Sequence, residues 1–410
     1  MGSMITLGIG KMEIDWGKNN IYRNHSKLFQ KSDRRSIPYY YSNEYSDELI
    51  IEMKDGFSRK MHFVKSRLDL LGYSMEKLEN TYNQFLKELD FHSIDVKIPF
   101  HVFKEVIYNI DVKKVNVLEF ELEGYQYGYD FGEYARDCLM KDAEINRLFE
   151  SYSEEHKFHL KYDLETYMEN IDPYVLIRII AENPMNNNLD LQWRYKDIVE
   201  GGWESEDNIF KGLDSKDKIL IVTEGSSDSF ILRKTLENLY VDVADFFEFV
   251  DMNENYPFTG VGNLYNFFLG LVRINVQNNI IIVFDNDIAG NEKYCLAKDK
   301  VTPDNIMIYK LPELQEFDSF QTIGPSGKSI EDINLKAVSI ECFLDLSNEK
   351  YAPLIRWMSY SKKVDQYQGV LVNKDKYVRR FKSIDLLNSS YNSCKLKFLI
   401  DDIIQKWITN

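Results

Sequence analysis

The chain has 410 residues, of which 44% are apolar and 28% charged, a balance typical of folded globular proteins with two or three domains. Its formal net charge of −16 argues against a protein that mainly coats nucleic acid, because neutralising phosphates requires clustered Lys and Arg. It leaves open an enzyme that acts on phosphates through a bound metal. No apolar run approaches the roughly 18 residues of a membrane helix, no secretory signal is visible, and the four cysteines are widely spaced, so we expect a cytoplasmic protein without a membrane partner.

The first half of the chain predicts an α+β domain over residues 1–210. Short β-like stretches fill the first 45 residues, and residues 59–90 have apolar residues at helical spacing, with GYS separating two helices. Residues 98–123 predict strands or a β-hairpin, and residues 130–182 return to a helical pattern. Residues 184–218 are polar, acidic and contain Gly and Asn, which indicates a linker.

In residues 211–345, strands alternate with helices. The expected strands are residues 218–225, 246–252, 279–287 and 305–312, and the expected helices are residues 226–240, 263–276 and 291–300. Strands that are almost continuously apolar are typical of a parallel sheet with helices on both faces. Ligands of such sheets bind outside the carboxyl ends of the strands. Glu224, Asp251, Asp285 and Asp287 all fall at such ends, so we expect them to lie together.

The acidic residues at these strand ends suit a divalent cation. Asp285 and Asp287 can both turn toward one crevice where the strand ends, and several convergent carboxylates are ligands that Mg²⁺ or Mn²⁺ prefers. Without a cation, their mutual repulsion and desolvation would destabilise the fold. Asp228 lies in the first turn of the helix after Glu224, where it serves either as a helix cap or as a further ligand.

Other sites also contain an Asp-x-Asp pair. A calcium-binding EF-hand is excluded because Ala289 and Leu296 occupy positions that require acidic residues. A phosphatase of the haloacid-dehalogenase type begins with a strand and Asp-x-Asp, but DNDIA matches its motif only in part and two strand–helix units precede it here. A glycosyltransferase leaves VTEG at residues 222–225 unexplained. Both enzymes stay open as alternatives.

The pairing of ILIVTEGSSDSFIL with IIIVFDNDIAG, with FTGVGNLYNFF between them, resembles the Toprim domain over roughly residues 216–345. The resemblance implies an α/β Toprim fold with a Rossmann-like parallel sheet as the catalytic domain, residues 211–345. It also implies metal-dependent cleavage of phosphodiester bonds in DNA or RNA, with Mg²⁺ or Mn²⁺ as cofactor.

The resemblance also implies roles for individual residues. It makes Glu224 a metal ligand or acid/base and Asp285 and Asp287 metal ligands. In the overcoming-lysogenisation-defect (OLD) nucleases, an aspartate at the position of Asp228 helps to hold a second metal ion. Those nucleases use later acidic residues too, for which Glu341 is the candidate ligand here. The alternative interpretation makes Glu341 an exposed carboxylate on a core helix.

Three upstream stretches, MITLGIGKMEIDWGKNN, RLDLLGYSMEKLE and LDLQWRYKDIVEGGW, resemble bacterial HEPN/Toprim-associated proteins. This implies that residues 1–210 are the accessory domain of that family and that the protein acts in bacterial conflict systems, including anti-phage defence. No arginine is followed by a histidine at the HEPN ribonuclease spacing, so we predict a partner-binding or assembly module. The alternative function of the whole chain is a non-catalytic or toxin-like sensor or assembly module of a defence complex. No P-loop is present, so an ATPase required for activation would be a partner, and oligomerisation stays open.

Residues 346–410 form an extension in which basic residues are interleaved with aromatic ones. The candidate nucleic-acid-binding residues are Lys362, Lys363, Lys374, Lys376, Arg379 and Arg380. Such a stretch suits a phosphate backbone. A solvated amphipathic surface whose Tyr and Trp pack inward is the alternative.

Overall fold

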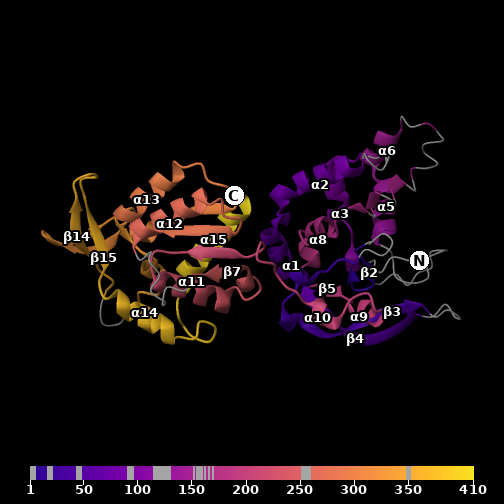
Figure 1. Ribbon diagram of the computed structural model, residues 1–410, viewed down its shortest axis with the longest axis horizontal. Helices are drawn as coiled ribbons and strands as arrows, with labels where there is room; N and C mark the ends of the chain where they lie inside the picture. Colours follow the sequence, from indigo (N-terminus) through magenta and orange to yellow (C-terminus); the bar gives the residue numbers. More distant parts are fainter. Residues whose placement is uncertain are drawn as a thin grey trace. The chain divides into compact units, whose positions relative to one another are not determined.

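The computed structural model describes residues 6–15, 22–42, 49–89, 97–113, 131–150, 153, 160, 163–164, 167–168, 170–250, 260–347 and 352–410. The chain divides into two compact units, Met1–Gly212 and Leu213–Asn410 (Figure 1). In these described ranges no helix has both the length and the apolar character needed to cross a bilayer. Asp251 and the strand expected at residues 114–123 lie outside the described residues.

The first unit contains a five-stranded antiparallel sheet in the order β2-β1-β5-β4-β3. Its strands are β1 (Leu7–Ile9), β2 (Met12–Glu13), β3 (Arg34–Ser42), β4 (Leu49–Lys60) and β5 (Asp190–Trp193). The loop after β2 is held by Asp15, whose Oδ1 accepts hydrogen bonds from the backbone N–H groups of Thr6 and Leu7 at 3.0 and 2.6 Å.

The helices of this unit surround one large apolar core. Among the residues that the structure describes, they are α1 (Met61–Leu68), α2 (Met75–Leu89), α3 (Phe100–Tyr108), α5 (Phe131–Lys141), α6 (Ala143–Phe149), α8 (Pro173–Ile180), α9 (Lys196–Glu200) and α10 (Glu206–Ile209). The expected break between the first two helices is confirmed: a π-helical turn, Asp69–Tyr73, contains Gly72 at φ 92°, a conformation that glycine adopts without a steric penalty. Helix α8 begins at an Asp-Pro pair: Asp172 is the N-cap, and its side chain accepts a hydrogen bond from the Tyr174 N–H.

Two sequence-based predictions for this unit are wrong. Residues 100–108 form α3 and not a strand, because Val102, Phe103 and Ile107 then share one face and bury it in the core. Residues 184–218 are not simply a linker, because they contain β5, which pairs with both β1 and β4 and buries Leu191 and Trp193. Only tertiary pairing distinguishes this short strand from its polar surroundings.

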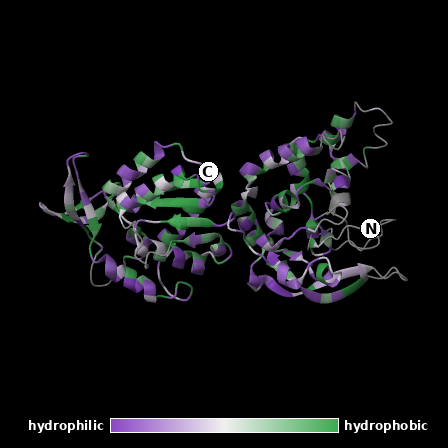
Figure 2. Ribbon diagram, in the orientation of Figure 1, coloured by the Kyte–Doolittle hydropathy of each residue, from purple (hydrophilic) through white to green (hydrophobic). Residues whose placement is uncertain are grey.

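The second unit contains the parallel sheet that the sequence predicts. Its order is β10-β8-β6-β7, with strands β6 (Ile219–Val222), β7 (Phe247–Phe249), β8 (Asn279–Phe284) and β10 (Ile306–Lys310). Figure 2 shows the two inner strands of this sheet, β8 and β6, as hydrophobic, as expected for strands that are buried on both faces.

Helices cover both faces of this sheet. On one face, α12 (Val261–Arg273) and α13 (Ile288–Lys298) pack over Ile280, Ile282 and Phe284. Helix α11 (Ser226–Leu239) lies on the other side of the sheet, and α15 (Cys394–Thr409) packs on α11 (Figure 1). The Tyr309 hydroxyl of β10 donates to Asp402 of α15 at 2.6 Å, which ties the C-terminal helix to the sheet. The molecule is therefore a mixed α/β protein.

A second sheet, in the order β12-β11-β14-β15, belongs to the same unit. Its strands are β11 (Phe320–Gly324), β12 (Gly327–Glu331), β14 (Ile355–Ser361) and β15 (Gln366–Leu371), and α14 (Lys374–Ser383) follows. A two-residue strand after β8, β9 (Asn286–Asp287), pairs antiparallel with β13 (Ala337–Val338). Strands from residues 320–331 and 355–371 thus form one sheet.

Candidate functional site

Glu224 and Asp285 follow two neighbouring strands. Strands β6 and β8 are parallel, with Val222 opposite Ile282, so the residues that follow them leave the sheet at the same edge. Thr223 is buried and its Oγ1 donates to the carbonyl oxygen of Gly225 at 2.9 Å, which shapes the turn after β6. The apolar strands therefore place both carboxylates at the carboxyl edge.

Asp228 caps α11 and is also one of the acidic residues at this edge. Its Oδ2 accepts from the backbone N–H of Gly225, the N-cap residue of α11, at 2.9 Å. The residue is buried, and the negative charge of Glu341 acts on its carboxyl. Capping and membership of the acidic set are thus compatible.

Asp287 is the N-cap of α13 and is held on both of its oxygens. Oδ1 accepts from the Gly290 N–H at 2.7 Å, and Oδ2 accepts from Nε2 of Gln368, on β15, at 2.7 Å. Gly290 is required here, because a Cβ at this position would lie 2.2 Å from the carbonyl oxygen of Asp285. The carboxylate therefore has a defined orientation.

Glu341 lies in a short 3₁₀ helix, Ile340–Phe343, and is buried, so its interpretation as an exposed carboxylate is wrong. Its Oε2 accepts from Ser339 Oγ at 2.7 Å, and its Oε1 lies 3.4 Å from Ser227 Oγ. The ammonium of Lys374, at the start of α14, lies 3.7 Å from the same Oε1. The fold thus brings Glu341 next to the first turn of α11.

Glu224, Asp228, Asp285, Asp287 and Glu341, here called the acidic set, interact electrostatically. Burial, and next the charge of Asp287, raises the pKa of Glu224 to about 7. Burial and the charge of Glu341 raise the pKa of Asp228 to about 7. Burial and the other four carboxylates raise the pKa of Asp285 well above its ordinary value. Burial raises the pKa of Asp287 against the opposing hydrogen bonds from the Gly290 and Ala289 N–H groups.

The chemistry of the acidic set fits a hard divalent cation, because it consists of carboxylate oxygens whose repulsion such an ion would relieve. As they are placed, however, no three His, Cys, Asp or Glu side chains within the described ranges are arranged to hold a metal ion. The carboxylates are near enough to shift one another's pKa but do not form a coordination shell.

The six basic candidates have different surroundings. Lys374 lies beside Glu341, and the Glu341 charge raises the pKa of this lysine. Arg380 instead pairs with Asp345 at 3.0 Å, and Lys363 pairs with Glu292 at 3.1 Å. Lys362, Lys376 and Arg379 are exposed. Of the six, the structure therefore brings Lys374 to the acidic set.

Sequence reasoning missed Gln368, Ser227 and Ser339, which hydrogen-bond to members of the acidic set. Ser227 is a neighbour of Asp228 and Ser339 precedes Glu341 by two residues, so both could have been suggested by proximity. Gln368 is 81 residues from its partner Asp287, and no pattern in the sequence connects the two.

Comparison with known families identifies the first half of the chain. Residues 1–217 match the family model described as HEPN/Toprim N-terminal domain 1. The chain belongs to the HEPN/Toprim family. No curated protein and no solved structure matches it. The matched residues include β5 and all the helices of the first unit, so the family-defining segment is the first unit, and the acidic set of this HEPN/Toprim protein lies beyond it.

Proposed function

We propose that the second unit is a Toprim-type phosphodiester hydrolase that cleaves DNA or RNA with Mg²⁺ or Mn²⁺. The observation that carries this proposal is the acidic set. Carboxylates from residues 224 to 341 lie near the carboxyl edge of a parallel sheet, and burial raises the pKa of four of them. Repulsion by neighbouring carboxylates adds to the rise for Glu224, Asp228 and Asp285. Perturbed carboxylates at such an edge are typical of functional sites. The family name, which pairs HEPN with Toprim, supports the same function.

The cation would be held by four carboxylates, those of Asp228, Asp285, Asp287 and Glu341. Glu224 would act either as a further ligand or as the acid/base. When bound, it would supply the positive charge that activates water and stabilises negative charge on the scissile phosphate. Glu224, with a pKa of about 7, is suited to take a proton from the attacking water or to return one to the leaving oxygen near neutral pH. Gln368 orients Asp287, and the Lys374 ammonium is placed to contact a phosphate oxygen.

The test is the cleavage of plasmid, linear DNA, single strands and transfer RNA by the purified chain, with and without Mg²⁺ or Mn²⁺. Asp285→Asn is expected to abolish metal-dependent cleavage while the protein stays folded. Asp299→Asn is the matched control, because Asp299 is an exposed aspartate at the C-terminal end of α13. Undiminished cleavage by Asp285→Asn would refute the site assignment.

One observation favours a second candidate function, a non-catalytic sensor or assembly module. Within the part of the chain that the structure describes, no three potential ligands are arranged to hold an ion. This alternative predicts that the wild-type chain binds a partner but cleaves none of the substrates with any metal. A phosphatase of the dehalogenase type would instead release phosphate from small esters.

We also propose that the cleavage serves anti-phage defence in bacteria, with an ATPase or another defence protein as partner. The support is the pairing of a nuclease-like acidic set with an accessory unit of the HEPN/Toprim family. The measurement is phage plaque formation on cells that carry the wild-type gene or Asp285→Asn. Equal protection by the wild-type and Asp285→Asn genes would show that the defence role does not depend on the acidic set.

A further inference from the structure

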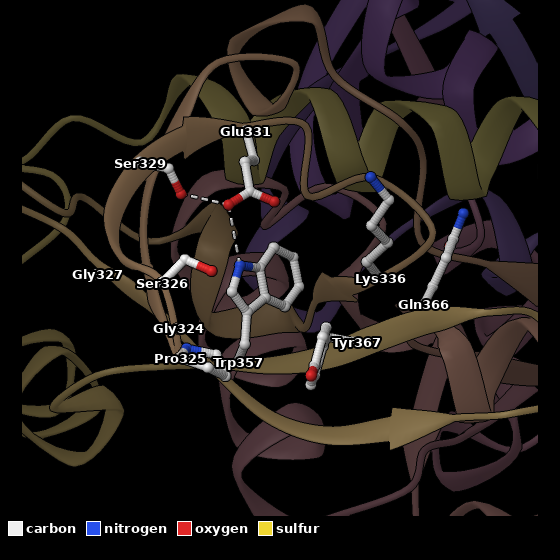
Figure 3. Close-up of a pocket in the computed structure, with 10 residues that line it drawn as sticks. All are labelled: Gly324, Pro325, Ser326, Gly327, Ser329, Glu331, Lys336, Trp357, Gln366 and Tyr367. Carbon is white, nitrogen blue, oxygen red and sulfur yellow. Dashed lines mark hydrogen bonds between the residues drawn. The ribbon is translucent and has the colours of Figure 1, made fainter.

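The second sheet of the second unit contains a pocket that no function has yet been given. It has a volume of about 310 Å³, and its walls come from β11, β12, β14, β15 and the turn between β11 and β12 (Figure 3). Its lining residues are Gly324, Pro325, Ser326, Gly327, Ser329, Glu331, Lys336, Trp357, Gln366 and Tyr367. The volume is at the small end of the range for ligand pockets, which suits a single ring system rather than a large cofactor.

The indole of Trp357, on β14, lies across the sheet. A Cβ on Gly324 of β11 would approach its Cδ1 to 2.9 Å, and a Cβ on Gly369 of β15 would approach its Cε3 to 2.9 Å. Strands β11 and β15 are the two neighbours of β14, so glycines on both sides make room for the two ends of the ring. An indole placed in this way has one face toward the backbone and offers the other to a ligand (Figure 3).

Next to the indole, Glu331 provides a hydrogen-bond acceptor. Its Oε1 accepts from Ser329 Oγ, from Thr322 Oγ1 at 2.9 Å and from Trp357 Nε1 at 3.3 Å. The Ser329 hydroxyl in particular lowers the pKa of Glu331, so the group is a carboxylate. Its Oε2 accepts no hydrogen bond from any described side chain or backbone group and is directed away from Ser329 in Figure 3.

One cation lies near this acceptor: Lys336 lines the pocket, and its charge helps to lower the pKa of Glu331. An aromatic face, an unused carboxylate oxygen and a nearby cation together fit a ring with N–H donors on its edge that is attached to an anion. A nucleobase with its phosphate has this combination.

The pocket is connected to the acidic set through two short pieces of backbone. Gln366 lines the pocket, and Gln368, two residues further along β15, donates to Asp287. Two residues of a strand span about 7 Å. Lys336 also lines the pocket, and the next residue, Ala337, pairs with Asp287 in the β9–β13 ladder. Both segments therefore lead from the wall of the pocket to a residue that contacts Asp287.

We propose that this pocket binds one unpaired base of a single-stranded nucleic acid, stacked on Trp357, and so presents an adjacent phosphate to the acidic set. This inference rests on the proposed function and specifies its substrate as single-stranded or locally unpaired. A base inside a duplex is stacked and paired, so both its faces and its N–H edge are already occupied.

The test measures binding without cleavage. The full chain in EDTA is titrated against fluorescently labelled eight-nucleotide oligo(dA), an abasic oligomer of the same length, and a blunt duplex, and anisotropy reports the affinity. Oligo(dA) is expected to bind more tightly than the other two. Trp357→Ala is expected to weaken oligo(dA) binding about 5- to 150-fold, the range for loss of one base–aromatic stack. Trp357→Phe retains an aromatic face and is expected to keep most of the affinity.

Trp203→Ala is the matched control, because Trp203 is half-exposed in the first unit, and its removal is expected to leave binding unchanged. Circular dichroism confirms that each variant is folded. Equal affinity for the abasic oligomer and oligo(dA), or wild-type affinity in a folded Trp357→Ala, would overturn the proposal. If the chain cleaves nucleic acid but shows no preference for oligo(dA), the base-binding role of the pocket is refuted and the proposed nuclease is not. Base-dependent binding without cleavage under any metal would refute the proposed nuclease alone.

Discussion

Replacing Glu224 with Gln should stabilise the metal-free protein above neutral pH. The Glu224 side chain accepts a hydrogen bond from the backbone N–H of Val261, which the amide oxygen of Gln can also accept. The substitution removes the charge that burial and Asp287 make unfavourable. We therefore expect Glu224→Gln to gain stability while it loses the carboxylate that the proposed chemistry uses.

The magnitude follows from the pKa of Glu224, which burial raises from 4.5 in the unfolded chain to about 7 in the folded protein. Because the folded state binds the proton more tightly, this group destabilises the fold progressively as pH rises from about 4.5 to about 7, and fully above about pH 7. At about 1.4 kcal/mol per pKa unit, the effect amounts to about 3 kcal/mol. The free energy of unfolding of the variant should exceed that of wild type by this amount at pH 8 and by almost nothing at pH 4.

The assay is amide hydrogen exchange of peptides from β6 and β8 at increasing urea concentration in EDTA, which reports the unfolding of the second unit alone. Glu237→Gln is the control, because Glu237 is an exposed carboxylate on the same unit, in α11. The raised pKa of Glu224 would be refuted if the gain in the free energy of unfolding were the same at pH 4 and pH 8. It would also be refuted if the Glu224→Gln variant were less stable than wild type at pH 8.

Three further predictions concern the same region. Gly290→Ala should destabilise the second unit by several kcal/mol, because the new Cβ would lie 2.2 Å from the carbonyl oxygen of Asp285. Gly270→Ala is the control: it lies in open space on α12 and should stabilise the unit by about 1 kcal/mol. Thermal melts of the two variants test the difference. Gln368→Leu should weaken Mg²⁺ binding about 10-fold by releasing Asp287, and calorimetry that finds wild-type affinity would contradict this. Mg²⁺ binding at pH 6.5 should release protons, since a cation displaces the proton that Glu224 holds below its pKa of about 7; calorimetric heats that do not depend on the buffer's ionisation enthalpy would exclude it.

The sequence by itself determined the parallel sheet and the place of four of the five acids. An apolar run such as NIIIVF at residues 279–284 is typical of a strand that is buried on both faces, so it predicts β8 and the strand end that carries Asp285. The order of strands and helices then places Glu224 at the same edge, because parallel strands end on the same side of a sheet. Likewise, Gly72 ends the first helix of the first unit for a local reason, its positive φ.

Only the tertiary structure decided the elements whose local pattern is weak or ambiguous. Residues 100–108 contain β-branched and aromatic residues that suit a strand, yet a helix buries one face of them in the core. Four residues in a polar segment became β5 because β1 and β4 offer hydrogen bonds on both sides.

The same limit applies to the site. Glu341 is buried beside Ser227, 114 residues away, and Gln368 reaches Asp287 across 81 residues. Trp357 is placed across its sheet by glycines on two different strands. Periodicity describes what one segment buries, whereas these contacts depend on which distant segments the folded chain brings together, and hydrogen-bond partners at that distance leave no local pattern in the sequence.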